Sequence, residues 1–383
     1  MTRYATYVAV LLAACWALLG LVTSSTARAE VGGAEPGGKL AVDLALAMYT
    51  GPRHLSGKLS IAGSDTMSPL MSKLAAQFRN LHPDVQIAVE TVGSNAAIRE
   101  FQLGLSYQRR GDKVRGKGTG GANRVELLAS SRPLTEAELQ GFESNHGYKP
   151  TGVPIAQDAV AIYVHKDNPI AQLTLNQVGA LFGQARAGSH PPISNWGQIG
   201  VAGTLATQPI VRYGRDRRSG TRAFFQHVAL NDAEYREDIL EQPGSASEIL
   251  SIAQDQAGIG YAGVGFQISL VRMVPISQSI DGPAFLPDRD HVRSGAYPLS
   301  RPLYLYVKRH PQEPLDPMVQ AFLLFIHSRQ GQETVGRVNL YPLDHEQVTT
   351  NLRTLGLAPA TASEPDDAFR EARESSADST ETR

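Results

Sequence analysis

The spacing of apolar residues predicts a chain in which strands and helices alternate. Residues 58–63, KLSIAG, alternate apolar and polar side chains, which is the pattern of a strand with one buried face. Apolar residues then recur every three or four positions, at Leu70, Leu74, Phe78 and Leu81, as one face of an amphipathic helix requires. The folded part of the chain is therefore expected to begin with a strand followed by a helix.

The same succession of patterns continues along the sequence. Further strands are expected at 85–93, 124–134, 158–169, 209–214, 257–265 and 302–310. Helices are expected at 94–104, 135–142, 173–184, 219–230 and 317–340, the first with a Ser/Asn cap and the last interrupted by glycine in its second half. This alternation is typical of an α/β protein with mainly parallel sheets.

The N-terminus has the pattern of an export signal. Arg3 precedes an apolar run at 5–22, and the small residues Ala27 and Ala29 follow, so we predict a signal peptide at 1–29 with cleavage after Ala29. The apolar run has about 18 residues, the lower edge of a spanning helix, so an uncleaved membrane anchor is an alternative. A second alternative is a lipoprotein, with the LAAC segment carrying a lipid on Cys15.

Composition limits the class of protein. The chain has 383 residues, 42% of them apolar and 19% charged, a balance that is typical of a folded globular protein. A formal net charge of −1 argues against a general nucleic-acid binder. Cys15 is the only cysteine, so a chain without its signal peptide has no disulfide, no thiolate metal site and no cysteine nucleophile.

Three segments lie outside the alternating pattern. Residues 30–57 are punctuated by Gly and Pro and are expected to form a leader into the fold. Residues 105–124 hold six basic residues and many glycines. They are interpreted as an inserted flexible loop, which either steers anions or contacts a partner, or is simply solvated. Residues 359–383 are acidic and poor in apolar side chains, so a disordered tail is expected there.

Hydroxyl residues and glycine gather at four places where a predicted strand ends and a helix begins. They are Ser64, Thr66 and Ser68; Ser94 and Asn95; Ser130 and Ser131, followed by Arg132; and Ser219, Gly220 and Thr221, preceded by Arg215. The first turn of a helix exposes unpaired N–H groups and the positive end of the peptide dipoles, which together can hold an oxyanion without a metal. Ser and Thr are also ordinary helix caps, so a single junction of this kind indicates nothing more than capping.

Convergence of several junctions on one cleft is harder to explain by capping alone, because ligands of open α/β sheets bind beyond the carboxyl ends of the strands. The fourth junction, GRDRRSGTR, adds positive charge where the backbone is already electropositive, which indicates an anion there. The guanidinium of Arg215 matches two oxygens of phosphate or sulfate. Arg217 and Arg218 are equally well interpreted as solvated surface charge, and Asp216 is expected to pair with a neighbouring arginine.

These segments resemble the periplasmic phosphate-binding proteins of bacterial ABC transporters, the PstS-like group of type II solute-binding proteins. The resemblance runs from Lys58 to Leu343 and is carried by GSDTMSPLMSKLAAQF, ETVGSNAAIREF, ASSRPLTEAEL, AVAIYVHKDNPIAQLTLNQVGALFGQ, ISNWGQI, GRDRRSGTRAFF, GIGYAGVGF and RPLYLYVKRHP. Their joint order along the chain is specific to the group.

The resemblance implies two hinged α/β lobes, each with a mostly parallel sheet flanked by helices, that close over a dehydrated oxyanion. We expect one lobe at 58–150 with 263–345 and the other at 151–262. The implied ligand contacts are Thr66 with the amide of Met67, Ser94, Ser131, Arg215, Ser219, Gly220 and Thr221. The implied partners are inorganic phosphate and an inner-membrane ABC permease, with no cofactor, metal or nucleic acid, and the protein is expected to be a monomer.

One departure concerns selectivity. Well-known members of the group carry an Asp where this chain has Ser131, followed by Arg132. That Asp accepts a hydrogen bond from a protonated phosphate oxygen and so helps to reject sulfate, because an unpaired buried acceptor disfavours the analogue. Asp65 is a candidate substitute acceptor.

Three classes of function remain for this sequence. The first is a binding protein that captures phosphate and delivers it to a permease. The second is a secreted phosphatase, but no metal-ligating cluster stands out, and scattered histidines are interpreted as surface or capping residues: His54, His82, His146, His165, His227 and His327. The third is a sensory, adhesive or scavenging exported protein with the same fold.

Overall fold

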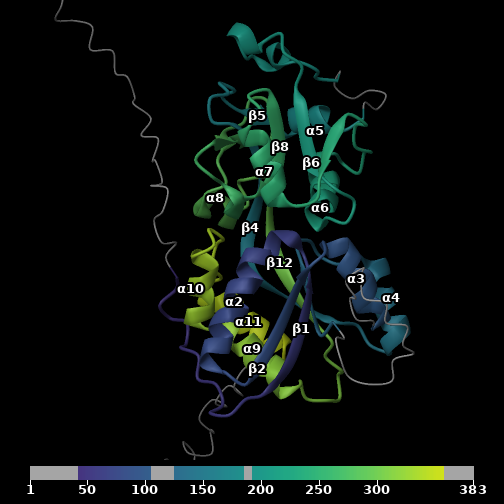
Figure 1. Cartoon of the computed structure of the whole chain (residues 1–383), viewed down its shortest axis with the longest axis vertical. Coiled ribbons are helices and arrows are strands. Elements are labelled where there is room, and N and C mark those ends of the chain that lie inside the picture. Colours follow the sequence, from purple (N-terminus) through teal and green to yellow (C-terminus); the bar gives the residue numbers. More distant parts are fainter. Residues whose placement is uncertain (1–41, 105–124, 185–191, 358–383) are drawn as a thin grey trace, which may run out of the picture. The chain divides into compact units, whose positions relative to one another are not determined.

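The computed structural model describes residues 42–104, 125–184 and 192–357 (Figure 1). The predicted signal peptide with Cys15, the first part of the predicted leader, the basic loop at 105–124 and the acidic tail at 359–383 lie outside these residues. None of the helices in the described part of the chain has both the length and the apolarity needed to cross a bilayer.

One large sheet organises the fold, with its strands in the order β2-β1-β3-β12-β4-β8-β6-β7 and with β9 also paired to β4. Its strands are β1 (Gly57–Gly63), β2 (Val85–Thr91), β3 (Leu127–Ser130), β4 (Thr151–His165), β6 (Val211–Arg215), β7 (Ile239–Gln242), β8 (Gly258–Gly263), β9 (Val271–Val274) and β12 (Ser300–Val307). A smaller sheet has the order β11-β10-β5, with β5 (Leu173–Thr174), β10 (Ile276–Ser277) and β11 (Ala284–Phe285).

The outer strands of the large sheet are parallel and its centre is antiparallel. β1 pairs in parallel with β2 and β3, and β6 pairs in parallel with β7 and β8. β12 is antiparallel to β3 and β4, and β4 is antiparallel to β8 and β9. The α/β class predicted from the sequence is confirmed, while the expectation of parallel pairing holds only away from β4 and β12.

Strand β4 connects the two parallel parts of the sheet. Its first half, from Thr151 to Ala159, pairs with β12, and the residues from Val160 to Val164 pair with β8. The sequence predicted this strand only from 158 onward, because Pro154 interrupts the pattern. The proline is accommodated by a register shift opposite Leu303 and Tyr304, a bulge of the kind that tolerates a missing N–H donor.

Helices cover the sheet on both faces. They are α2 (Ser68–Leu81), α3 (Ser94–Leu103), α4 (Glu136–His146), α5 (Leu175–Phe182), α6 (Gly220–Ala229), α7 (Ser245–Ala253), α8 (Arg289–Arg293), α9 (Pro317–Ile326), α10 (Arg329–Gly336) and α11 (His345–Thr354). Leu59 and Ile61 of β1 belong to the core that contains α2 and α9, whereas Ala62 packs with α3 and α4 (Figure 1). The alternation of side chains along β1 therefore serves two layers of helices.

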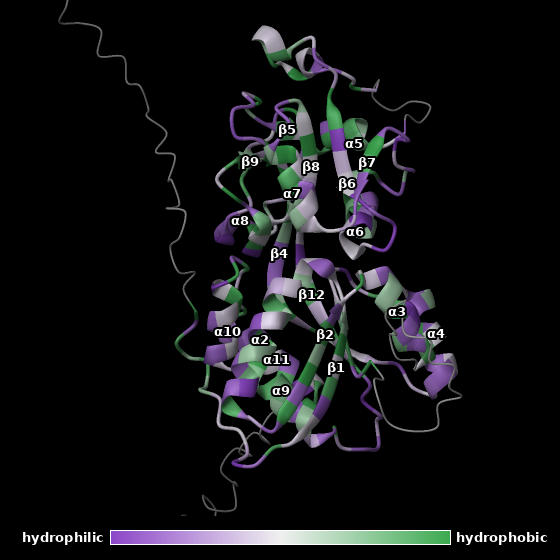
Figure 2. Ribbon diagram, in the orientation of Figure 1, coloured by the Kyte–Doolittle hydropathy of each residue, from purple (hydrophilic) through white to green (hydrophobic). Residues whose placement is uncertain are grey.

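The core follows the apolar pattern, with two local differences. Figure 2 shows hydrophobic residues concentrated in the strands and on the inner sides of the helices. Leu70, Leu74 and Phe78 are fully buried on α2, but Leu81 at its end is 51% exposed, so the predicted apolar face stops one turn earlier. Ser94 is the first residue of α3 and not its cap, which is Gly93.

The long C-terminal helix predicted at 317–340 is two helices. α9 ends at Ile326, and Ser328 then caps α10 by accepting the Gly331 N–H with its hydroxyl oxygen at 3.3 Å. His327 lies between them, 3% exposed, and its ring bonds to the Leu323 carbonyl at 2.8 Å. A capping serine inside an apolar period thus breaks a helix that the period alone would continue.

The described part of the predicted leader is packed against the fold. Leu46 is buried in a cluster with Leu343 and Val348. The ring centroids of Tyr49 and Phe325 are 5.5 Å apart. The hydroxyl of Tyr49 also bonds to His82, a buried residue at the end of α2, at 2.9 Å. Residues from 42 onward therefore belong to the folded body and are not a free leader.

Candidate functional site

The four predicted junctions all lie where the sequence placed them, at strand ends that lead into helices. Thr66 and Met67 lie in the short 3-10 helix η1 (Asp65–Met67) between β1 and α2. Ser94 begins α3 after β2, Ser131 follows β3, and Gly220 begins α6 after β6. The first, second and fourth junctions lie at the first turn of a helix, as the oxyanion hypothesis requires, whereas Ser131 precedes α4 by five residues and that helix is capped by Thr135.

The first and fourth junctions meet through two threonines. The hydroxyl oxygens of Thr66 and Thr221 are 2.8 Å apart, although 155 positions separate the residues in the sequence. Thr221 is fully buried, Thr66 is 3% exposed, and Met67 is fully buried beside it. Two donors from remote parts of the chain are therefore held together away from solvent.

The second, third and fourth junctions meet at Gly220. The hydroxyl oxygens of Ser94 and Ser131 are 3.3 Å apart, and the Ser131 N–H donates to the Ser94 oxygen at 3.2 Å. A Cβ atom on Gly220 would lie 2.5 Å from the Ser94 oxygen and 2.8 Å from that of Ser131. Only glycine fits this approach, so the start of α6 lies directly against the two hydroxyls.

Arg215 ends β6 as a buried guanidinium whose Nε–H has no hydrogen-bond partner. It is 1% exposed, and its Nη1 donates to the Ser245 hydroxyl at 2.7 Å and lies 3.3 Å from Asp65 Oδ2. Nη2 donates to the Pro243 carbonyl at 3.3 Å, whereas the Nε–H is buried without a hydrogen-bond partner. A buried unpaired donor on a cation is costly, and an anion is the group that would pair it best.

The other arginines of this region have structural or surface roles. Arg212 is buried and donates hydrogen bonds to the carbonyls of Leu181 and Ile210. Burial lowers its pKa to about 10. Arg217 and Arg218 are exposed, which supports their interpretation as solvated charge. The expected pairing of Asp216 is confirmed by Arg218 at 2.6 Å.

Ordinary capping explains several of the junction residues. The Ser219 hydroxyl oxygen accepts the Arg222 N–H at 3.2 Å as the N-cap of α6, and the Ser130 hydroxyl donates to the Arg132 carbonyl at 2.7 Å. The Asn95 side chain donates to the carbonyls of Arg217 and Ser219, so it joins the second junction to the fourth. These bonds hold the junctions together, and ordinary capping and loop contacts account for them without a ligand.

Arg132, the residue after Ser131, does not replace the acidic side chain that is missing at position 131. Its guanidinium pairs with Glu138 at 2.7 Å and with the Asn95 amide oxygen at 2.8 Å. Ser131 itself is fully buried against Ser94. The position that carries an Asp in well-known members of the resembling group is therefore a buried neutral hydroxyl, which can donate or accept.

A buried ion pair next to the site was missed by the sequence reading. Arg301 of β12 donates to Asp158 Oδ2 from Nε at 2.9 Å and from Nη2 at 2.8 Å, and both side chains have no exposed surface. Its Nη1 also donates to the Ser131 carbonyl at 3.1 Å. A lone Asp in the apolar run AQDAVAIYV was the available signal, since a buried carboxylate needs a partner.

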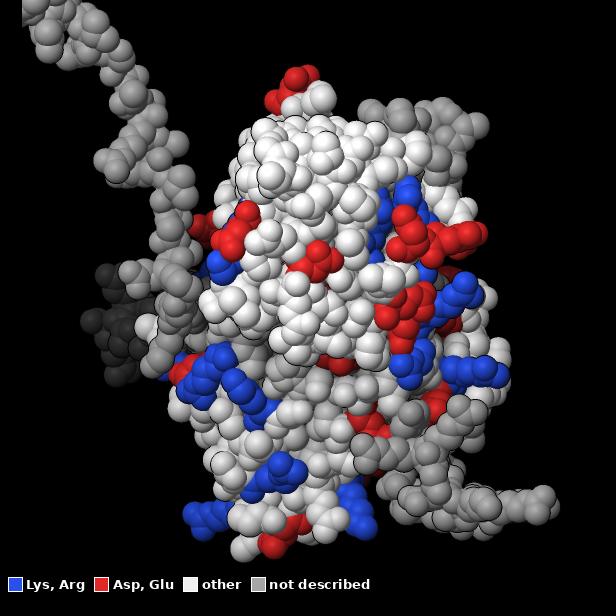
Figure 3. Space-filling model, turned by 45° about the horizontal axis from the view of Figure 1, so that its top comes forward, with Lys and Arg blue, Asp and Glu red and all other residues white. Residues whose placement is uncertain are grey.

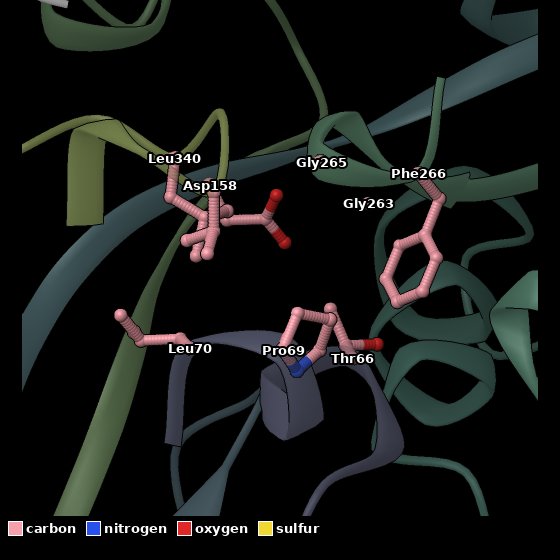
Figure 4. Close-up of a pocket in the computed structure, with 9 residues that line it drawn as sticks. Thr66, Pro69, Leu70, Asp158, Gly263, Gly265, Phe266 and Leu340 are labelled. Carbon is pink, nitrogen blue, oxygen red and sulfur yellow. The ribbon is translucent and has the colours of Figure 1, made fainter. Parts of the chain in front are cut away.

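A small pocket adjoins this pair. Thr66, Asp158 and Gly263 line it together with Pro69 and Phe266, and Figure 4 shows the Asp158 carboxylate directed into the space between Thr66 and Phe266. Val264 N–H donates to Asp158 Oδ1 at 3.3 Å at its edge. The pocket therefore connects the buried ion pair with the first junction.

A second buried acid, Glu248 of α7, lies behind Arg215. Its Oε1 accepts the Tyr261 N–H at 2.9 Å, while its Oε2 is buried without a partner. Burial raises the pKa of Glu248 to about 8, opposed by the positive charge of Arg215. The carboxyl is therefore largely protonated at neutral pH. The sequence signal for this part was QPGSAS at 242–247, a fifth strand-turn-helix junction that went unrecognised because β7 is short.

The groups gathered at the junctions are hydrogen-bond donors, the kind of group that suits an anion. No group of His, Cys, Asp and Glu in the described ranges is arranged to hold a metal ion. Figure 3 shows charges of both signs interspersed on one face of the molecule, around a broad area without charged side chains. What converges at the junctions is a set of buried hydroxyl and amide donors with one guanidinium, an arrangement suited to a small multiply charged oxyanion.

Comparison with known proteins places the chain in a family. A family model described as a PBP superfamily domain matches residues 49–330. The phosphate-binding protein PstS of Pseudomonas aeruginosa is 38% identical over 319 residues, covering 83% of this chain and 93% of that protein. The PstS protein of Staphylococcus haemolyticus is 26% identical, covering 73% of this chain and 79% of that protein.

Solved structures agree with this placement. A Clostridium perfringens protein solved with bound phosphate matches with a TM-score of 0.59 and 26% identity, over 75% of this chain and all (100%) of that one. An ABC-type phosphate transport receptor from Vibrio cholerae matches in fold with a TM-score of 0.55 at 22% identity, over 74% of this chain and 100% of that one. Because the family consists of binding proteins, the choice of a binding protein over a secreted phosphatase is confirmed. The chain belongs to the PstS-like phosphate-binding proteins of the PBP superfamily.

Proposed function

We propose that the protein binds inorganic phosphate at the converging junctions and delivers it to the permease of an ABC transporter. The ligand contacts in this proposal are Thr66, the Met67 amide, Ser94, Ser131, Arg215, Ser219, Gly220 and Thr221. The observation that carries the proposal is that Thr66 meets Thr221 while Gly220 lies against Ser94 and Ser131, which brings four separate segments together in buried surroundings. It rests as well on the 38% identity to a PstS protein.

The donor set suits phosphate for a physical reason. Hydroxyls and amides at helix starts are neutral, so they can be buried together without mutual repulsion and still stabilise an anion. The unpaired Nε–H of Arg215 supplies one charge-assisted bond. When phosphate is buried it loses its bound water, and the fixed donors of the site would take the place of that water. The two predicted lobes would then close around the anion.

Export completes the proposal. The predicted signal peptide would place the mature protein in the periplasm, where a permease in the inner membrane would receive the phosphate. In a strain that lacks its own phosphate-binding protein, the full-length chain together with its cognate permease should restore phosphate uptake. Uptake that stays at the level of the deletion strain would contradict delivery, even if binding in vitro is normal.

Calorimetric titration tests the binding step. The wild-type protein should bind one phosphate per chain, and Thr221→Asp should bind none, because a carboxylate among the oxyanion donors repels the ligand. Thr350→Asp is the matched control, since Thr350 lies exposed on α11 and the substitution adds the same charge far from the site. Undiminished affinity in Thr221→Asp would contradict the site assignment.

Selectivity is tested in the same experiment by competition with sulfate across pH. With a neutral hydroxyl at Ser131, the proton of phosphate has an acceptor only if that hydroxyl turns its lone pair toward it. We expect discrimination against sulfate that is present but smaller than an ionised acceptor gives. Equal affinity for the two anions would mean that no residue at the site accepts the phosphate proton.

A further inference from the structure

Asp65 belongs to the first junction, but its carboxylate contacts segments remote in sequence. Its Oδ2 accepts the Ser245 N–H at 2.9 Å and lies 3.3 Å from Nη1 of Arg215. The same Nη1 donates to the Ser245 hydroxyl at 2.7 Å. Asp65, Arg215 and Ser245 therefore form one closed cluster of contacts, which we call the Asp65 clip.

The start of α7 is shaped to receive this carboxylate. A Cβ atom on Gly244, the N-cap residue, would lie 3.2 Å from Asp65 Oδ1, so glycine leaves room for the approach. Glycine also offers no capping oxygen, and the Ser245 N–H is satisfied by Asp65 instead. Asp65 thus acts on α7 as an N-cap aspartate would, from 180 positions away.

The clip joins the two predicted lobes at the proposed ligand site. Asp65 lies in the segment assigned to the first lobe, whereas Arg215 and Ser245 lie in the segment assigned to the second. Asp65 is also the neighbour of Thr66, whose hydroxyl meets that of Thr221. The clip therefore lies next to a contact between proposed ligand donors of both predicted lobes.

We propose that Asp65 is a positioning residue that holds Arg215 against α7 and keeps the site closed around bound phosphate, so that it slows phosphate release. The inference rests on the proposed function. Its chemistry is a charge-assisted contact between a carboxylate that is 28% exposed and a guanidinium that is 2% exposed. In this arrangement Asp65 occupies Nη1 of Arg215 and leaves the unpaired Nε–H to the ligand.

Affinity alone cannot test the role of Asp65, because its negative charge also repels phosphate through space. Removing the charge should speed association because the repulsion is lost, and it should speed release because the clip is lost. Long-range attraction and repulsion are screened at about 0.5 M sodium chloride, where the screening length is a few ångströms. Partly buried charges such as that of Asp65 are screened less, so the release rate at this salt concentration is compared with that of a control that loses a neighbouring carboxylate but no clip contact.

Phosphate release is measured by stopped flow into an excess of a fluorescent phosphate sensor. The first variant, Asp65→Asn, keeps an acceptor for the Ser245 N–H but loses the negative charge that faces Arg215. The second, Asp65→Ala, loses both the acceptor and the charge. The matched control is Asp216→Asn, which removes the same charge from the junction beside Arg215; within the described residues, the side chain of Asp216 pairs with Arg218 and not with Arg215. Equilibrium affinity for phosphate is measured on each variant by calorimetry.

We expect release to be about tenfold faster in Asp65→Ala, about threefold faster in Asp65→Asn, and within about twofold of wild type in Asp216→Asn. A release rate of Asp65→Ala within twofold of wild type would overturn the inference while leaving phosphate binding intact. It would also be overturned if Asp65→Asn matched wild type, since the hydrogen bond to α7 would then suffice, or if Asp216→Asn matched Asp65→Asn. Wild-type protein that bound no phosphate would overturn the proposed function itself.

Discussion

Replacing Asp158 with Asn leaves the guanidinium of Arg301 buried without a counter-charge. Asp158 Oδ2 accepts two bonds from Arg301, and Oδ1 accepts the Val264 N–H, so every contact of the carboxylate is with a donor. An Asn amide has one acceptor and one donor end, and in either orientation its NH₂ group faces one of these donors. The substitution therefore removes the charge and also creates a donor–donor conflict.

Both side chains are without exposed surface, so solvent cannot replace the lost partner. Breaking a buried pair from one side costs about 3–5 kcal/mol of unfolding free energy, because the remaining charge is uncompensated. Arg301→Met in addition to Asp158→Asn removes that charge, and neutral replacements of buried pairs cost little or nothing. The double variant should therefore recover at least about 1 kcal/mol relative to Asp158→Asn alone.

Urea unfolding, followed by circular dichroism at neutral pH, measures these free energies. Asp158→Asn should lower the unfolding midpoint without changing the slope, and the double variant should lie between it and wild type. Glu136→Gln is the control, because its pair with Lys149 is exposed on both sides and exposed ion pairs contribute little to stability. A loss below about 1 kcal/mol in Asp158→Asn, or additive losses in the double variant, would refute the reasoning.

Three further predictions concern buried charge. Arg215→Ala should weaken phosphate binding by about 2–4 kcal/mol in calorimetry, and a loss below about 0.5 kcal/mol would mean that Arg215 makes no contact with the ligand. Burial raises the pKa of Glu248 from 4.5 to about 8, so the folded state favours the protonated acid. Wild type should therefore lose roughly 5 kcal/mol of unfolding free energy as pH rises between these values. Glu248→Gln should lack this loss, and parallel stability–pH curves for the two proteins would contradict the prediction. Burial lowers the pKa of His327 from 6.5 to about 4. Its contribution to the unfolding free energy is therefore present above pH 6.5 and should fall by roughly 3 kcal/mol as pH decreases to 4. His327→Gln should flatten this part of the stability–pH curve measured by urea unfolding, and an unchanged acid limb would contradict the prediction.

The elements that the sequence predicted are those whose signals are local. β1, β6 and β8 followed from alternation or short apolar runs, and α2 and α6 from apolar residues at helical spacing. The start of β4 did not, because Pro154 is tolerated only through a bulge against a strand some 150 residues later in the sequence. Pairing direction was equally non-local, since nothing in β12 itself states that it lies antiparallel between β3 and β4.

The candidate site shows the same division. Thr66, Ser94, Ser131 and Gly220 were found because each lies at a strand-to-helix junction that is visible in a few consecutive letters. Their contacts with each other depend on chain topology and on the absence of a Cβ at Gly220. A partner such as Ser245 could be found only by extending the same junction rule to a very short strand, β7.

Charge pairing explains how this site can be buried before any ligand arrives. The guanidinium groups of Arg215 and Arg301 are both buried beside the site, and each lies within reach of a carboxylate, Asp65 or Asp158. The nearby acid Glu248 is largely uncharged at neutral pH, so it does not upset the balance. With the charges already compensated, the groups left over for an anion are neutral hydroxyls, backbone amides and one N–H of Arg215. Phosphate held mainly by such donors would form no strong ion pair of its own, so its release would require opening only the Asp65–Arg215 contact between the predicted lobes, while the Asp158–Arg301 pair stays intact.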